Sequence, residues 1–283
     1  MTTVHAAATA AVDDAASLAG MTAPATAPAL LAISHGTSSP AGAGAVATLV
    51  DAVAARLGGP SGDSSGGPSG GPSGGQVPVH AGFVDVQQPD VPTCLGGLRD
   101  SAARRTVVVP LLLSAGYHVH VDLREDVDAA AAAGQDVVLA GALGPDDRLV
   151  GLLARRLAEV GLAGDDVVVL AAAGSSDPRA VADCEETAAR LAERLGRRVR
   201  VGYVANATPR VHEALDAARA ERPGGRVVVA SYLLAPGFFA DLAARAGGDV
   251  TSAPLLVAGQ DAPAELVDVV RDRFRAAAGA PRG

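Results

Sequence analysis

The feature that most constrains the fold of this chain is an internal repeat. The segment 30–40, LLAISHGTSSP, resembles the segment 170–178, LAAAGSSDP. Aligning Gly36 with Gly174 places the two segments 138 residues apart. Self-similarity of this kind indicates a structural unit that occurs more than once in the chain.

Two further matches follow in the same order at a shorter offset of 120 residues. The segments 82–91 and 107–117 resemble 202–211 and 227–238. The 18-residue difference in offset equals the length of the stretch 58–75, which contains only Gly, Pro, Ser and Asp. This stretch has no apolar side chain to bury, so we expect a flexible surface insertion. The remaining chain is then two copies of one unit.

Each copy alternates short apolar runs with Ala-rich segments. The runs predict buried strands near 29–34, 77–84, 105–113 and 136–140, and again near 166–172, 199–204, 226–234 and 250. Segments such as 146–160 and 178–196 predict helices between them. Alternating strands and helices indicate an α/β fold with parallel sheets that helices cover on both faces.

The repeat also predicts the domain organisation. We expect a disordered tail over 1–28, an amino-terminal lobe over 29–143 and a similar carboxyl-terminal lobe over 144–283. Each lobe is a small parallel sheet flanked by helices. Ligands of such sheets bind beyond the carboxyl ends of the strands, so a cleft between the two lobes is the expected site.

Composition excludes several classes of protein. The formal net charge is -8, and all 23 basic residues are Arg, which argues against a general nucleic-acid binder. Cys94 and Cys184 are too far apart in sequence to indicate a disulfide framework or an iron–sulfur cluster. The first 28 residues lack the basic start of a secretory signal, and we expect no membrane-spanning run. A cytoplasmic protein fits these features.

Two histidines follow strands of the first copy. His35 comes directly after the first strand, and His118 lies just past the third, at the same edge of the predicted sheet. Two neutral imidazoles can hold a divalent metal such as Fe²⁺, Co²⁺, Ni²⁺ or Zn²⁺. The second copy has Ala173 and Phe239 at these positions. The fold therefore does not require the histidines, which favours a role in a single site.

Other polar residues near these strands allow more than one interpretation. Asp85 follows the second strand and is an acid, a base or a third ligand, or else a solvated loop carboxylate. His120 is a possible third ligand that a helix would direct elsewhere. We expect Thr37 or Ser38 to cap the following helix. A single histidine after a strand can also simply cap a helix or bind a carbonyl.

Three motifs together resemble the sirohydrochlorin chelatases, the class II chelatases that include the CbiX and SirB types, in their two-domain form. The motifs are Ser34-His35-Gly36-Thr37, Phe83-Val84-Asp85 with Pro89, and Gly116-Tyr117-His118 with Asp122. The resemblance extends over about residues 29 to 277. It implies insertion of Fe²⁺ or Co²⁺ into sirohydrochlorin, in siroheme or cobalamin biosynthesis, without ATP.

The resemblance also implies roles for individual residues. His35 and His118 would hold the metal and act in catalysis with Asp85, at a position where Glu is more usual in the family. The neighbouring loop residues would bind the tetrapyrrole: Ser34, Gly36, Thr37, Gly116 and Tyr117. The chain lacks the His-rich stretch and the iron–sulfur extension of some long members.

The expected substrate carries many carboxylates. We expect helix N-termini, such as those after Gly36 and Gly174, and Arg side chains to hold them, in an electropositive cleft on an acidic body. Because one chain contains both lobes, we expect a monomer.

Three alternatives remain open from the sequence. A tetrapyrrole or metal carrier would use the same histidines without turnover. A phosphatase or mutase would usually have Arg directly before the histidine, where this chain has Ser34. A plain α/β scaffold would have to explain why the histidines occur in only one copy.

Overall fold

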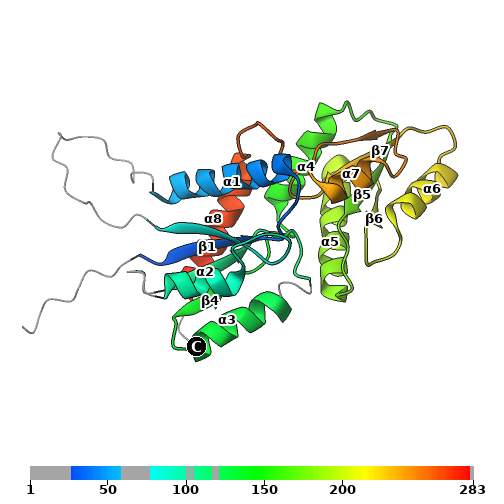
Figure 1. The fold of residues 1–283 in the computed structure, drawn as a ribbon. Helices are drawn as coiled ribbons and strands as arrows, with labels where there is room; N and C mark the ends of the chain where they lie inside the picture. Colours follow the sequence, from blue (N-terminus) through cyan, green and yellow to red (C-terminus); the bar gives the residue numbers. More distant parts are fainter. Residues whose placement is uncertain (1–26, 59–76, 100–102, 104, 117–120, 281–283) are drawn as a thin grey trace, which may run out of the picture.

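The computed structural model describes residues 27–58, 77–99, 103, 105–116 and 121–280, and it contains two parallel sheets. The first has four strands in the order β2-β1-β3-β4, and every neighbouring pair is parallel. These strands are β1 (Ala29–Ser34), β2 (Val79–Phe83), β3 (Thr106–Pro110) and β4 (Val137–Leu139). Figure 1 shows this sheet beside the first helices of the chain.

The second sheet repeats the first, with the order β6-β5-β7-β8 and parallel pairing throughout. Its strands are β5 (Val167–Ala172), β6 (Val199–Tyr203), β7 (Val227–Tyr232) and β8 (Val250–Thr251). The central strands β1, β3, β5 and β7 are almost wholly buried, as parallel strands covered on both faces must be. The predicted α/β fold with two similar lobes is confirmed.

Eight helices are described in the ranges given above. They are α1 (Pro40–Gly58), α2 (Val91–Leu98), α3 (Leu123–Ala132), α4 (Asp147–Glu159), α5 (Pro178–Leu195), α6 (Val211–Glu221), α7 (Phe238–Ala244) and α8 (Ala264–Ala278). On one face of the first sheet, Leu95 of α2 and Leu123 of α3 pack with Ile33 of β1. On the corresponding face of the second sheet, Leu215 of α6 and Ala243 of α7 pack with Val169 of β5.

The other two faces share one continuous core, because the last helix of each copy of the repeat packs on the sheet of the other copy. Helix α4 follows β4 but packs on α5 and β7 of the second lobe. Helix α8 follows β8 but packs on α1, β3 and β4 of the first lobe (Figure 1). A division of the chain at 143/144 therefore follows the strands, whereas the core of the first lobe includes residues near the carboxyl terminus.

The two lobes repeat in backbone detail as well as in topology. Gly36 has a φ of +88° and Gly174 a φ of +89°. A Cβ atom at Gly36 would lie 2.3 Å from the carbonyl oxygen of Asp85, and one at Gly174 would lie 1.9 Å from that of Ala205. Only glycine fits both the left-handed conformation and this close approach.

Helix α1 corrects one expectation about the chain. Its 19 residues are long and apolar enough to cross a membrane by length and composition, although no such run was expected. Core helices of soluble proteins meet the same criterion. Leu49 and Val53 of α1 lie in the shared core, and the helix packs against α8.

Candidate active site

His35 lies where strand β1 ends, beside the loop that follows β2. Ser34, the last residue of β1, is buried, whereas the His35 side chain is exposed. The Ser34 carbonyl accepts a hydrogen bond from Val84 N at 2.9 Å, and the His35 carbonyl accepts one from Asp85 N at 3.2 Å. The structure therefore brings the predicted residues His35 and Asp85 together on adjacent loops.

A side chain that the sequence did not single out fixes these two loops. Gln87 Oε1 accepts a hydrogen bond from Thr37 N at 2.9 Å. Gly36, which lies between His35 and Thr37, packs on the Asp85 carbonyl. The second copy has Ala207 where the first has Gln87, and this difference between the copies is the sequence signal that could have identified Gln87.

The second copy keeps this backbone arrangement without the polar side chains. Ala205 N donates to the Ala173 carbonyl at 2.8 Å, which reproduces the bond between Asp85 and His35. Alanine thus stands at both equivalent positions. Because the same backbone forms with methyl groups, the fold requires neither the imidazole of His35 nor the carboxylate of Asp85.

The cap of helix α1 differs from the prediction. Ser39, rather than Thr37 or Ser38, is the cap, and its Oγ accepts from Gly42 N at 3.3 Å. The Thr37 hydroxyl oxygen instead accepts from Ser39 N at 3.1 Å. A cap must lie directly before the first helical residue, here Pro40, to reach the free N–H groups.

The start of helix α5 argues against one expected role. Asp177, the counterpart of Ser39, caps α5 and accepts from Arg179 N at 2.9 Å. The side chain of Arg179 also pairs with this carboxylate at 2.8 Å. The Asp177 carboxylate already occupies this N-terminus and disfavours a second carboxylate there, and the expected binding of substrate carboxylates after Gly174 stays a prediction.

The third predicted segment is only partly described. Leu111 N, just past β3, donates to the Ile33 carbonyl at 2.7 Å, so the end of β3 lies beside the end of β1. Gly116 is described, but Tyr117, His118 and His120 lie outside the described residues. Their place in the site stays a prediction. Within the described ranges, no group of three His, Cys, Asp or Glu side chains could hold a metal.

The second lobe holds the backbone that leads to this segment. Tyr232, the last residue of β7, donates its hydroxyl to the Leu113 carbonyl at 3.0 Å. Asp183 Oδ2 accepts from Ala115 N at 2.7 Å. A Cβ atom at Gly116 would lie 3.0 Å from Ser175 Oγ. The carboxyl edges of the two sheets therefore meet, and the second lobe fixes the chain up to Gly116.

Asp183→Ala is expected to lower the free energy of unfolding by about 1–3 kcal/mol, because it leaves the half-buried Ala115 N–H without its charged acceptor. Chemical denaturation measures the loss. Glu185→Ala, an exposed change on the same helix, is the control and should alter stability by less than about 0.5 kcal/mol. Equal stability of the two variants would show that the hydrogen bond between Ala115 N and Asp183 does not contribute to the free energy of unfolding.

The buried side chains of Cys184 and Tyr232, beside the contact between the lobes, stay protonated. Burial raises the pKa of the Cys184 thiol to about 12, so it stays protonated at neutral pH. Burial also raises the pKa of the Tyr232 hydroxyl, which remains a hydrogen-bond donor. Cys184 is part of the core that the two lobes share.

The charge at the first lobe differs from the expected electropositive cleft. Carboxylates gather at this edge on Asp85, Asp90 and the start of α3. Burial, followed by the charges of Asp122, Asp90 and Glu125, raises the pKa of Asp126. This edge is therefore acidic in the described residues. It suits a metal dication better than an anionic ring, so the charge distribution here does not support an anionic substrate.

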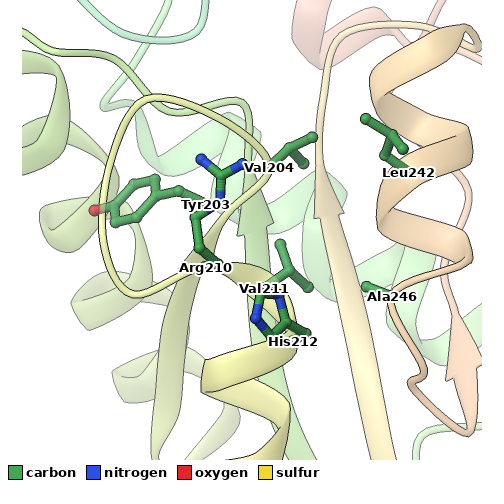
Figure 2. A pocket seen from close by; sticks show the side chains of 7 residues that line it. All are labelled: Tyr203, Val204, Arg210, Val211, His212, Leu242 and Ala246. Carbon is green, nitrogen blue, oxygen red and sulfur yellow. The ribbon is translucent and has the colours of Figure 1, made fainter.

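A basic residue takes the corresponding place in the second lobe. Arg210 bridges to Tyr203 as Asp90 bridges to Phe83 in the first lobe. It lines a pocket of about 250 Å³ with His212 on one side and Leu242 of α7 on the other (Figure 2). Within the described part of the chain, no carboxylate pairs with the Arg210 guanidinium. Arg210 is thus a basic residue at the carboxyl edge of the second sheet, where the first sheet has Asp90.

Comparison with known proteins identifies the family. The family model described as CbiX matches residues 29–160 and 167–244. A sirohydrochlorin ferrochelatase of Priestia megaterium is 31% identical over 160 residues, and this chain covers 60% of its length. A sirohydrochlorin cobaltochelatase of Sulfurisphaera tokodaii is 29% identical over 82 residues, which cover 67% of its length.

The fold has a close structural counterpart. A structure of SirB from Bacillus subtilis with Fe³⁺ has a TM-score of 0.71 at 20% sequence identity, covering 90% of this chain and 96% of that chain. At this identity the likeness shows the fold alone. The family model, in contrast, matches well over half of the residues and includes His35 and Asp85. This chain belongs to the CbiX family.

Proposed function

We propose that this protein inserts Fe²⁺ or Co²⁺ into sirohydrochlorin. The observation that carries the proposal is the backbone hydrogen bond that places His35 and Asp85 on adjacent loops, in a chain of the CbiX family, at the edge where the two lobes meet. The names of the relatives, a ferrochelatase and a cobaltochelatase, support the substrate and leave the choice of metal open.

In the proposed mechanism, the metal ion is a substrate that His35 and His118 hold weakly. A closed site of four protein ligands would retain the metal, whereas fewer ligands allow its release. The acidic residues of the first lobe raise the local concentration of the dication. The ion then moves to the four ring nitrogens, and no ATP is needed because the metallated ring is the stable product.

Proton transfer balances the reaction. Two pyrrole N–H groups lose their protons as the metal bonds to the ring, so one dication enters and two protons leave. The Asp85 carboxylate, or an imidazole that has released the metal, accepts these protons and passes them to water. The exposed position of both side chains gives them access to solvent.

An anaerobic absorbance assay with sirohydrochlorin and either Fe²⁺ or Co²⁺ tests the proposal. A spectrum that shifts to the metallated ring over many turnovers, faster than ring and metal alone, supports an enzyme. A single stoichiometric shift would instead indicate the carrier of tetrapyrrole or metal. The ratio of the two rates gives the metal preference, with Ni²⁺ and Zn²⁺ as surrogates. A cytoplasmic monomer remains our expectation, which light scattering tests for the oligomeric state.

Asp85→Ala is expected to lower kcat/KM about tenfold, because one proton acceptor is lost while the histidines remain. Stability should not change, since Ala205 occupies the same backbone position in the second copy. The measurement is the rate of metal insertion, with Asp216→Ala, an exposed change on α6, as the control. A full rate in Asp85→Ala would identify Asp85 as a solvated loop carboxylate.

A further inference from the structure

Two of the few aromatic side chains of this protein are exposed beside one another. The chain has four Phe, three Tyr and no Trp. Phe238 is 66% exposed and Phe239 is 38% exposed at the start of α7, with ring centroids 6.1 Å apart. Among the described residues, the other large exposed hydrophobic side chain is Val86, at 59%. Large apolar groups that remain in water together often mark a binding surface.

Val86 and the backbone that precedes Phe238 lie next to the loops of the candidate site. Val86 directly follows Asp85 and has a φ of +65°, which is uncommon for a β-branched residue. The backbone before Phe238 touches the first lobe: a Cβ atom at Gly237 would lie 3.2 Å from Thr37 Oγ1. Thr37 is two residues from His35. The chain that leads directly into the aromatic pair of the second lobe thus contacts the loop of the first lobe that carries His35.

The repeat shows what the second lobe has in place of the metal-binding residues. Phe238 and Phe239 align with Tyr117 and His118 of the first copy. An imidazole that would hold a metal is replaced by a phenyl ring that cannot. The two lobes therefore present different chemistry at equivalent positions, a polar acidic edge and an exposed aromatic pair.

We propose that Phe238 and Phe239 form an apolar face against which the flat ring system of the tetrapyrrole packs. The inference rests on the proposed function. A conjugated macrocycle offers a broad apolar face with anionic groups at its rim, and aromatic rings bind such a face through burial and offset stacking. Packing there would place one side of the ring against the second lobe and leave its nitrogens open to a metal from the first.

The occupant is a small molecule rather than a second protein, because the surface is small and chemically mixed. The two Phe side chains are the exposed large apolar groups of α7, and Asp241 follows in its first turn. A stable protein interface would need a larger area with a continuous apolar centre.

The test measures binding of metal-free sirohydrochlorin, by its own fluorescence under anaerobic conditions, to the full chain. The double variant Phe238→Ser, Phe239→Ser is expected to bind about tenfold more weakly, and its KM for the ring should rise while its KM for the metal stays constant. The double variant with Tyr at both positions keeps the rings and should bind within about twofold of the wild type.

Stability separates this effect from misfolding. Because Phe238 is largely exposed and Phe239 is partly exposed at the molecular surface, the Ser variant should remain folded, which chemical denaturation checks. If it metallates sirohydrochlorin and binds the free ring as tightly as the wild type, the apolar face is not the binding surface. The same conclusion follows if the Ser variant loses only self-association in light scattering. If the wild type itself neither binds nor metallates the ring, the proposed function fails instead.

Discussion

Replacing His35 by alanine is expected to lower the rate of metal insertion by about 100-fold or more while leaving the fold intact. The imidazole follows β1 at the edge where the lobes meet, and it is exposed beside Asp85. Its loss removes one of the two proposed metal ligands. A single remaining imidazole binds a dication too weakly to position it for transfer to the ring nitrogens.

The second copy predicts that this variant stays folded. Ala173 occupies the position of His35, and its carbonyl accepts the same hydrogen bond from the neighbouring loop. The free energy of unfolding of His35→Ala should therefore match that of the wild type. A large loss of rate with unchanged stability places the effect in the chemistry rather than in the fold.

The anaerobic absorbance assay measures the rate, and calorimetry with Co²⁺ measures metal binding. The control variants are His80→Ala on the edge strand β2 and His212→Ala on α6, two exposed histidines with no proposed role. Both should retain nearly the full rate. If His35→Ala retains it as well, then the histidine site is misassigned and the acidic edge alone must handle the metal.

The repeat made the fold predictable, because its local signals agree with its tertiary structure. The apolar runs are short and β-branched, and each matches a strand within a few residues, as β1 does over Ala29–Ser34. Because the unit occurs twice, each strand and helix of the fold is predicted from two separate segments of the sequence. The left-handed glycines after β1 and β5 show the same agreement, since Gly36 and Gly174 precede helices in both lobes.

The exchange of helices between the lobes could not be predicted in this way. Helix α8 has an apolar stripe that suits either sheet, and sequence periodicity does not identify the partner that a stripe packs against. Its contacts with β3 and α1 depend on how the two lobes are placed. Only the tertiary structure therefore shows which lobe α4 and α8 belong to.

Two features of the site, its acidic edge and the role of Gln87, could not be predicted from the sequence. The total charge of -8 says nothing about where charges gather, and the acidic edge around Asp126 appears only once α2 and α3 are packed together. The role of Gln87 depends on the approach of two loops 50 residues apart. The position of His35 and Asp85 at one edge of the sheet was predictable because both directly follow strands of one parallel sheet, and their roles stay predictions.

Phe274→Ala is expected to lower the free energy of unfolding by about 3–5 kcal/mol, the largest stability effect among these variants. Phe274 is 3% exposed in the core that the two lobes share. Its removal leaves a cavity that the surrounding β-branched and leucine side chains fill only in part. Arg275→Ala, the exposed neighbour on the same helix, should cost less than about 0.5 kcal/mol.

Because α8 packs on α1, β3 and β4, Phe274→Ala should lower stability most in the lobe that carries His35. Denaturation gives the total loss, and amide hydrogen exchange shows where it occurs. Exchange in β3 should accelerate more than exchange in β7, although Phe274 follows β7 in sequence. Faster exchange confined to β7 would mean that α8 stabilises its own half of the chain. The predicted pattern makes the histidine lobe dependent on the last helix, so a fragment that ends at residue 143 should not fold.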